Sequence, residues 1–302
     1  MEQKGFWLRL INGQKRFARG WWPSAAEPST IVCVVPGLGE HSGRYTPFAA
    51  HLVNAGFGVV SLDVQGQGLS PGWRGCITSY DDLLGEVAAL VRFARGGEAL
   101  RRVVVGESWG SDEPVALEGW PEERKLPVCL YGHSMGGNLV LSSAMRGVAD
   151  PDRIIASGPM LRAVHPPTPS IIRLARILKM VAPHFCLRAP VRKEFLSHIE
   201  SETEAYAKDP LVHRRVSLRL GAALIDSGQW LLNHAQKLQT PCLMLHGGDD
   251  RITDPDATRQ FAKAALLANA ASQLTIYPGM LHDIHRDIGR EHVVADIIEW
   301  CR

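Results

Sequence analysis

Short apolar runs alternate with longer amphipathic segments along most of this chain. The short runs are rich in valine and isoleucine, which favour strands. They fall at residues 30–35, 57–62, 128–131, 154–156, 242–245 and 274–277. Helical spacing of apolar residues falls at residues 45–55, 81–94, 137–146, 255–268 and 291–300. Continuous apolar strands that alternate with helices predict an α/β protein with a parallel sheet covered on both faces.

The strand pattern stops in the middle of the chain. Between residues 159 and 226 the sequence is a mostly helical mixture of polar and apolar residues, which prolines interrupt. Among these prolines are Pro166, Pro167, Pro169, Pro183 and Pro190. We therefore predict one sheet domain in two parts, residues 1–158 and 227–302, with a cap inserted between them at residues 159–226.

Length and charge fit this organisation. A chain of 302 residues, 45% of them hydrophobic, can bury a large core. Its 33 lysine and arginine residues nearly balance 31 aspartate and glutamate residues, which leaves a formal net charge of +2. Because binding to a phosphate backbone requires a strongly basic surface, we expect no nucleic-acid partner.

The lengths of the apolar runs bear on cellular location, and the cysteines bear on disulfide formation. The first residues include charges and form no apolar run of signal-peptide length, and nowhere do about eighteen apolar residues follow one another. The sequence therefore predicts a cytoplasmic protein, with peripheral membrane contact left open. The six cysteines form no Cys-x-x-Cys motif, and we expect free thiols rather than disulfide bridges. They are Cys33, Cys76, Cys129, Cys186, Cys242 and Cys301.

One serine stands between a predicted strand and a predicted helix. The connecting sequence is Gly132-His133-Ser134-Met135-Gly136-Gly137. Such a tight turn exposes the Ser134 hydroxyl only if the residues two before and two after it lack side chains, and glycines occupy both positions. The helix that follows directs its first amides, starting with that of Met135, toward the same point, where they can stabilise an oxyanion. Ser134 is therefore the candidate nucleophile.

A second copy of the G-x-S-x-G pattern centres on Ser108. It follows an apolar run, but Pro114 comes soon after it, where a helix would need its first turns. This position indicates a loop or hairpin, so we prefer Ser134.

A serine nucleophile needs a histidine base and a carboxylate that orients the base. In this type of fold the chain order is serine, acid, histidine. Asp250 follows the strand at 242–245, and His282 follows the strand at 274–277, so both lie where parallel sheets place their ligands. We assign Asp250 as the acid and His282 as the base. The competing residues are Asp249, Asp254 and Asp256 for the acid, and His246 and His285 for the base.

An early loop offers the second oxyanion donor. Glycines 37, 39 and 43 follow the strand at 30–35 and let the backbone approach a substrate, and the amide of Leu38 is the candidate donor. The same glycines, with Asp63 ending the next strand, resemble a dinucleotide-binding pattern, and an oxidoreductase is the alternative. That pattern places its third glycine one residue late and leaves Ser134 unexplained. We expect no cofactor and no metal, since His282 and His285 lack a third ligand at a recognised spacing.

Several longer strings occur in one order along the chain. They are Gly37-Leu38-Gly39-Glu40-His41-Ser42-Gly43-Arg44-Tyr45, the segment from Asp63 to Ser70, the Ser134 turn, Asp209-Pro210-Leu211-Val212, and the loops at Asp250 and His282. Together they resemble the monoacylglycerol lipase and lysophospholipase family of α/β-hydrolases, over nearly the whole chain. The resemblance implies a mostly parallel sheet of about eight strands, with helices on both faces and an inserted helical cap.

The resemblance also implies a site. Its triad is Ser134, Asp250 and His282, and its oxyanion hole is formed by the amides of Leu38 and Met135. In monoacylglycerol lipases four polar positions line the end that receives glycerol, and here they correspond to Glu40, Arg44, Tyr206 and His285. The alternative for two of them is that Glu40 and Arg44 pair with each other and brace the loop.

The chain departs from the family pattern in two places. The oxyanion loop begins with Pro36 and Gly37 where the family has His-Gly, which affects the shape of the loop more than its backbone donor. Residues 98–125 are longer than the family needs at this point, and we interpret them as a surface insertion.

The sequence thus predicts a serine hydrolase that cleaves lipid esters, either monoacylglycerol or lysophospholipid. Alternatives on the same fold are a small-ester carboxylesterase and a serine aminopeptidase, in which Glu40 would bind the substrate ammonium. A non-catalytic scaffold is a third class. The oligomeric state is left open.

The predicted cap helix at residues 170–181 has two interpretations. Arg173, Arg176 and Lys179 recur every three residues along an otherwise apolar helix. The helix either rests transiently on a membrane surface or packs over its own pocket with its charges in water.

Overall fold

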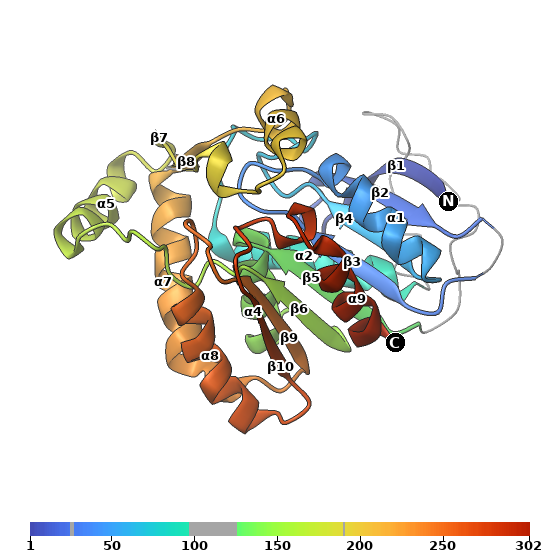
Figure 1. Cartoon of the computed structure of the whole chain (residues 1–302). Helices are drawn as coiled ribbons and strands as arrows, with labels where there is room; N and C mark the ends of the chain where they lie inside the picture. The colour runs from blue at the N-terminus through green and yellow to red at the C-terminus, as the bar shows by residue number, and fades with distance from the viewer. Residues whose placement is uncertain (25–26, 97–125, 190) are drawn as a thin grey trace.

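The structure is a computed structural model that describes residues 1–24, 27–96, 126–189 and 191–302. An eight-stranded sheet runs through its centre in the order β1-β2-β4-β3-β5-β6-β9-β10 (Figure 1). The strands are β1 (Glu2–Arg9), β2 (Lys15–Trp22), β3 (Ile31–Val35), β4 (Gly58–Leu62), β5 (Val128–His133), β6 (Arg153–Ser157), β9 (Cys242–Gly247) and β10 (Gln273–Tyr277). All neighbours from β4 to β10 are parallel. The predicted mostly parallel sheet is confirmed.

The N-terminal hairpin of β1 and β2 was not predicted from the sequence. The two strands pair antiparallel, and β2 pairs antiparallel with β4 at the edge of the parallel sheet. Gly13 lies in the connecting turn at φ 79°, and its amide donates to Leu10 O at 2.9 Å. Asn12 and Gly13 between two aromatic-rich runs are the sequence signal for such a hairpin.

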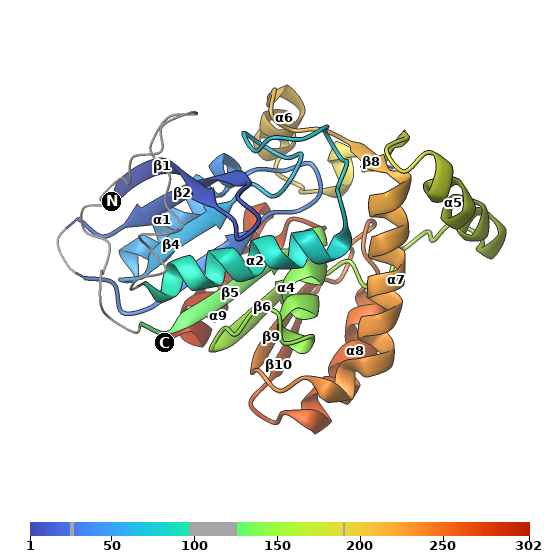
Figure 2. The same cartoon turned by 180° about the vertical axis from the view of Figure 1, so that it is seen from behind.

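Helices cover both faces of the sheet. Figure 1 shows α1 (Thr46–Asn54) and α9 (Arg290–Cys301) on one face. Figure 2 shows α2 (Tyr80–Arg95) and α4 (Met135–Met145) on the other, with α7 (Leu218–His234) and α8 (Pro255–Ala268) beside them. A hydrophobic core lies on each face of the sheet. Alternate side chains of β3 point to opposite faces: Cys33 and Val35 belong to one core, and Val32 and Val34 belong to the other. Both faces of the strand are therefore buried, which explains its continuous apolar run.

The predicted cap segment, residues 159–226, contains a small sheet as well as helices. Its elements are α5 (Pro169–Val181), β7 (Cys186–Arg188), α6 (Glu200–Lys208), β8 (Arg215–Ser217) and the first half of α7. β7 and β8 pair antiparallel apart from the main sheet. The predicted boundary after residue 226 falls inside α7, and the division into core and cap stays a prediction.

The described residues also form short 3₁₀ helices. They are η1 (Ser42–Tyr45), η2 (Lys193–Phe195), η3 (Ala235–Lys237) and η4 (Ile284–Arg286). Within the described ranges, no helix combines the length and apolar character needed to cross a membrane. The predicted insertion at 98–125, which includes Ser108, lies outside the described residues.

Candidate active site

Ser134 occupies a sharp turn between β5 and α4. Its backbone has φ 56° and ψ −116°, and it is the one non-glycine residue with positive φ among those described. Holding a non-glycine residue in this region costs of order 1–3 kcal/mol, so neighbouring contacts must maintain it. The Ser134 amide donates to Ser157 O at 2.9 Å, and the Ser134 carbonyl accepts from the amides of Asn138 and Met160. The turn is thus fixed from both sides.

Two glycines permit this turn because other backbone atoms occupy the space of their missing side chains. A Cβ at Gly132 would lie 2.3 Å from Gly136 O, and a Cβ at Gly136 would lie 2.0 Å from Val35 O. The strand β3, the turn and the helix α4 therefore approach more closely than any side chain allows. The spacing of glycines around Ser134 has a direct steric cause.

Replacing Gly136 with alanine is expected to lower the free energy of unfolding by about 3 kcal/mol or more, since the new methyl group collides with backbone rather than with a movable side chain. Gly85→Ala in α2 is the matched control. No atom lies within 4 Å of a Cβ built there, and alanine in a helix interior is about 1 kcal/mol more favourable than glycine. Urea unfolding of both variants checks this, and equal stabilities would contradict the steric account.

Asp250 and His282 form a hydrogen-bonded pair after β9 and β10. His282 Nδ1 lies 2.6 Å from Asp250 Oδ2, and both side chains are buried. The other carboxylate oxygen, Oδ1, accepts from the amides of Ile252 at 2.7 Å and Thr253 at 3.0 Å. These amides fix the carboxylate, and the carboxylate in turn fixes the imidazole tautomer that leaves Nε2 free to act as a base.

Charges around the pair shift both pKa values. Burial alone would raise the pKa of Asp250, but His282 and His246 hold it well below its usual range. Burial alone would lower the pKa of His282, but Asp250 and, more weakly, Asp283 raise it above its usual value. The pair therefore favours an ionised carboxylate beside an imidazole that accepts a proton readily.

The competing acids lie elsewhere. Asp249 is exposed to solvent. Asp254 caps α8, where its side chain accepts from the amide of Asp256, and it pairs with Arg162 at 2.7 Å. Asp256 lies in the exposed first turn of that helix. Among these four aspartates, Asp250 is the one that is hydrogen-bonded to His282.

The competing histidines are both buried away from Ser134. His246 Nε2 lies 3.1 Å from Asp250 Oδ2, the same carboxylate oxygen that binds His282. His246 Nδ1 lies 2.8 Å from Thr258 Oγ1. His285 stacks on the ring of Tyr45 with centroids 5.3 Å apart. Neither residue lines the pocket above Ser134.

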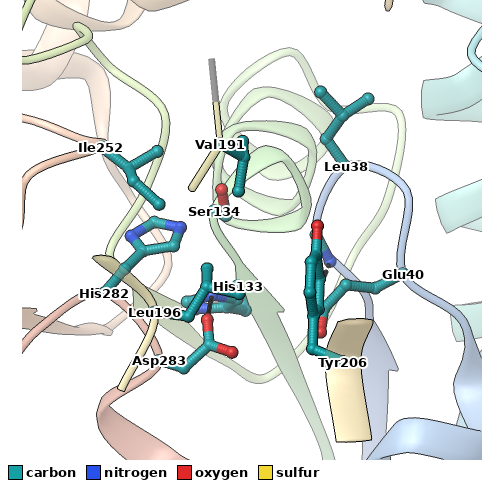
Figure 3. Close-up of a pocket in the computed structure, with 11 residues that line it drawn as sticks. Leu38, Glu40, His133, Ser134, Val191, Leu196, Tyr206, Ile252, His282 and Asp283 are labelled. Atoms are coloured by element: carbon teal, nitrogen blue, oxygen red, sulfur yellow. Dashed lines mark hydrogen bonds and ion pairs between the residues drawn. The ribbon is translucent and has the colours of Figure 1, made fainter. Parts of the chain in front are cut away.

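Ser134 and His282 face the same pocket (Figure 3). Its lining residues are Gly37, Leu38, Glu40, His133, Ser134, Val191, Leu196, Tyr206, Ile252, His282 and Asp283. The cavity measures about 30 Å³, which is room for about one water molecule. Among the described residues no hydrogen bond joins Ser134 Oγ to His282, a contact that commonly tightens only when substrate is bound.

Of the two predicted oxyanion donors, Leu38 lines this pocket and Met135 follows Ser134 in the chain. Leu38 lies in the loop after β3 and lines the cavity, and Met135 is the first residue of α4. In the described part of the chain neither amide has a hydrogen-bond acceptor. Amides that are fixed in place and unpaired are what an oxyanion hole requires.

Asp63 has a structural task that differs from binding a ribose. Its carboxylate accepts from the amide of Ser42 at 2.6 Å and from that of Leu69 at 2.8 Å. Both oxygens are thus used to hold two loops together beneath the surface. This arrangement leaves the dinucleotide alternative without its acidic residue.

The four predicted polar residues separate into two groups. Glu40 and Tyr206 line the pocket. Arg44 lies beside it, with its Nε 3.0 Å from Glu40 Oε1 and its guanidinium 5.0 Å from the centre of the Tyr206 ring. His285 lies behind the pocket against Tyr45. A role for all four in binding substrate stays a prediction.

Glu40 is the centre of a buried ionic network. Its Oε1 accepts from Arg44 and from Arg286, each at 3.0 Å, and its Oε2 accepts from Tyr45 Oη at 3.0 Å and from the Gly37 amide at 3.3 Å. Burial would raise the pKa of Glu40, but Arg286 and Arg44 hold it well below its usual range. Glu40 thus remains ionised and ties the oxyanion loop to η4.

Two residues next to the predicted triad were missed. His133 Nε2 lies 3.0 Å from Asp283 Oδ1, and both side chains line the pocket floor. With His282 they are the described group nearest to a metal site, since their candidate ligand atoms lie within 4.8 Å of one another. His282 is already bonded to Asp250, and His133 and Asp283 are bonded to each other. The sequence signal for His133 and Asp283 was that each lies next to a predicted triad residue, His133 before Ser134 and Asp283 after His282.

Known proteins are similar to this chain in sequence and in fold. A family model described as "Serine aminopeptidase, S33" matches residues 26–112 and 115–289. An uncharacterized abhydrolase domain-containing protein of Dictyostelium discoideum is 25% identical over 97% of this chain, which spans 28% of that protein. The monoacylglycerol lipase of Mycolicibacterium smegmatis is 27% identical over 95% of this chain and 93% of its own length.

A solved structure agrees with these relatives. The crystal structure of the Paleococcus ferrophilus monoacylglycerol lipase matches with a TM-score of 0.78 and 26% identity, over 95% of this chain and 98% of that one. The predicted resemblance and the α/β-hydrolase fold are confirmed. Because the family model covers most of the sequence, the chain belongs to the serine aminopeptidase S33 family of hydrolases.

Proposed function

We propose that the protein is a serine hydrolase that cleaves carboxylic esters of lipids, with monoacylglycerol as its substrate. One observation carries the proposal. Ser134 on its strained turn and His282 bonded to Asp250 face one pocket that is apolar on one side and polar on the other. The similarity to monoacylglycerol lipases supports the choice of substrate.

The geometry is suited to acyl transfer through a covalent intermediate. As Ser134 Oγ attacks the ester carbonyl carbon, His282 Nε2 takes its proton, and the amides of Leu38 and Met135 stabilise the resulting oxyanion. His282 then gives the proton to the alkoxide as the ester C–O bond breaks, which leaves the acyl group on Ser134. Water cleaves this acyl-enzyme by the same route, and a fatty acid is released.

The pocket lining supports an apolar acyl group and a polar alcohol. Leu38, Val191 and Ile252 surround the upper part of the site in Figure 3, whereas Glu40 and Tyr206 lie together on one side. An acyl chain gains from the apolar side chains, and a small polyol can bond to the Tyr206 hydroxyl. This division favours an ester that joins a fatty acid to a small polar alcohol.

The network around Glu40 bears on the aminopeptidase alternative. A substrate ammonium group requires a carboxylate with unused negative charge. Arg44 and Arg286 already neutralise Glu40, and Tyr45 occupies its second oxygen. The structure therefore favours a neutral alcohol at this end of the site.

Helix α5 supports the proposal of contact with a lipid surface. It has no buried residue, and it projects from the rest of the molecule beside α7 in both views (Figures 1 and 2). Arg176 pairs with Asp226 of α7, and Lys179 Nζ lies 3.9 Å from the same carboxylate. Its exposed apolar side chains are Ile171, Leu174, Ile177, Leu178, Met180 and Val181. An apolar face of this kind suits shallow insertion into a bilayer interface.

The substrate assignment is tested by fatty-acid release from a long-chain monoacylglycerol, a lysophospholipid and a short soluble ester. We expect monoacylglycerol to give the highest kcat/KM. Faster release from lysophospholipid would change the assigned alcohol, and hydrolysis of the short ester alone would remove the lipid assignment.

The same assay distinguishes contact of α5 with a lipid surface from hydrolysis of the ester itself. Met180, in α5, is 81% exposed, and Leu267, in α8, is 86% exposed. Met180→Glu is expected to lower turnover of monoacylglycerol presented in vesicles and to leave the short soluble ester unaffected, whereas Leu267→Glu changes neither rate. Equal vesicle turnover for both variants would contradict the role of α5.

A further inference from the structure

Two cysteines from distant parts of the sequence meet between the core and the cap segment. Cys76 Sγ lies 3.3 Å from Cys186 Sγ, and 110 positions separate the two residues along the chain. Cys76 is buried in the loop before α2, and Cys186 is half-buried at the start of β7. A disulfide bond is about 2.05 Å long, so the two sulfur atoms need to approach by little more than 1 Å to become bonded.

Backbone contacts hold the two segments in this position. The amide of Ser217 in β8 donates to Gly75 O at 2.9 Å, next to Cys76, and Ser217 pairs with Cys186 across β7 and β8. A Cβ at Gly75 would lie 2.1 Å from Arg215 O, so the loop and β8 are in close contact. The thiols therefore meet at a packed junction and not through two freely moving loops.

We propose that Cys76 and Cys186 are a redox modification site, at which a reversible disulfide joins the loop before α2 to the cap segment. The oxidant is a small disulfide such as oxidised glutathione. The thiolate of Cys186, the more exposed residue, attacks one glutathione sulfur and releases the first glutathione thiolate. The Cys76 thiolate then attacks the Cys186 sulfur and releases the second. Two protein thiols lose two protons and two electrons, and one glutathione disulfide becomes two glutathione thiols.

The second step requires the Cys76 thiolate. Burial, together with the hydrogen bond between the Cys76 and Cys186 thiols, raises the pKa of Cys76 to about 11. Few Cys76 side chains are thiolates at neutral pH, so ring closure is expected to accelerate as the pH increases.

The disulfide has a consequence for the pocket. The cavity above Ser134 has room for about one water molecule, and side chains of the cap segment, Val191, Leu196 and Tyr206, form part of its lining. A long acyl ester therefore requires these side chains to move. Cys186 precedes Val191 by five positions, so a bond from Cys186 to the core restrains the start of this lining segment. This consequence rests on the proposed function, whereas the formation of the bond does not.

The bond is tested directly by mapping peptides. The full-length protein is incubated with oxidised or with reduced glutathione, blocked, and digested with trypsin without reduction. We expect one cross-linked species that joins residues 75–92 to residues 180–188 and is two hydrogen masses lighter than the sum of the two peptides. It should form only after oxidation, and treatment with dithiothreitol should remove it. If oxidation gives no such species, the proposed site is overturned, whatever the enzyme hydrolyses.

Activity tests the consequence. Oxidation is expected to remove most turnover of long-chain monoacylglycerol, to affect a short soluble ester less, and to be reversed by dithiothreitol. Cys186→Ser and Cys76→Ser are both expected to keep their turnover after oxidation, and Cys186→Ser, at the less buried position, carries the test if the other variant fails to fold. If oxidation inhibits wild type and Cys186→Ser equally, or if the completely cross-linked protein keeps full turnover, the proposal that the disulfide limits access to the pocket is overturned. Inactivity of the reduced wild type would instead refute the proposed function.

Discussion

Replacing Ser134 with alanine is expected to lower kcat for ester hydrolysis by about 10⁴-fold or more, because loss of the nucleophile removes the covalent route and leaves only the oxyanion hole and binding. The Ser134 backbone conformation is strained in the wild type as well, so alanine should change the free energy of unfolding little. Steady-state kinetics with the preferred ester and urea unfolding separate the two effects.

Two other serines serve as controls for this change. Ser143 lies in α4, the helix that follows Ser134; it is buried, and its hydroxyl has no hydrogen-bond partner among the described residues. Ser143→Ala is therefore expected to keep wild-type kcat. Ser108 centres the second G-x-S-x-G pattern of the sequence, and Ser108→Ala is also expected to keep it. Loss of activity in Ser108→Ala with activity retained in Ser134→Ala would reverse the assignment.

Replacing Asp250 with asparagine is expected to lower kcat by about 10⁴-fold while leaving a measurable trace of activity. An asparagine side chain can present its amide to His282 Nδ1, which favours the tautomer in which Nε2 carries the proton and cannot accept one from Ser134. Binding of the ester relies on other residues, so KM should change much less than kcat.

Asp249→Asn is the matched control, because Asp249 precedes Asp250 in the chain and is exposed to solvent. We expect it to behave as wild type in kcat. Circular dichroism of both variants would show whether Asp250→Asn also loosens the loop, since Asp250 accepts from the amides of Ile252 and Thr253. Full activity in Asp250→Asn, with loss in Asp249→Asn, would show that the acid was wrongly assigned.

Much of the parallel sheet could be predicted because its central strands β3, β4, β5 and β9 are buried on both faces and so appear as apolar runs. The turn at Ser134 could be predicted for a steric reason, since Gly132 and Gly136 have no substitute at their positions. The hairpin of β1 and β2 escaped prediction because these two antiparallel strands mix polar and apolar residues, and its signal lay in the Asn12 and Gly13 turn instead.

Contacts between distant segments could not be predicted from patterns along the chain. The pairing of Glu40 with Arg286 joins residues 246 positions apart, and no local spacing indicates it. The basic residues of α5 show the same difficulty. Their regular spacing predicted a basic stripe directed toward a membrane or toward water, and did not indicate that Arg176 and Lys179 face Asp226 on α7. Which side of a helix meets a neighbour depends on packing that periodicity does not specify.

The most direct test of the central claim is covalent labelling with a fluorophosphonate, followed by mass spectrometry of the modified peptide. The reagent reacts with a serine that a neighbouring base has activated. We predict a single adduct on Ser134 in the wild type and none in the Ser134→Ala variant. An adduct on another serine, or no adduct on a folded wild-type protein, would contradict the assignment of Ser134 as the nucleophile.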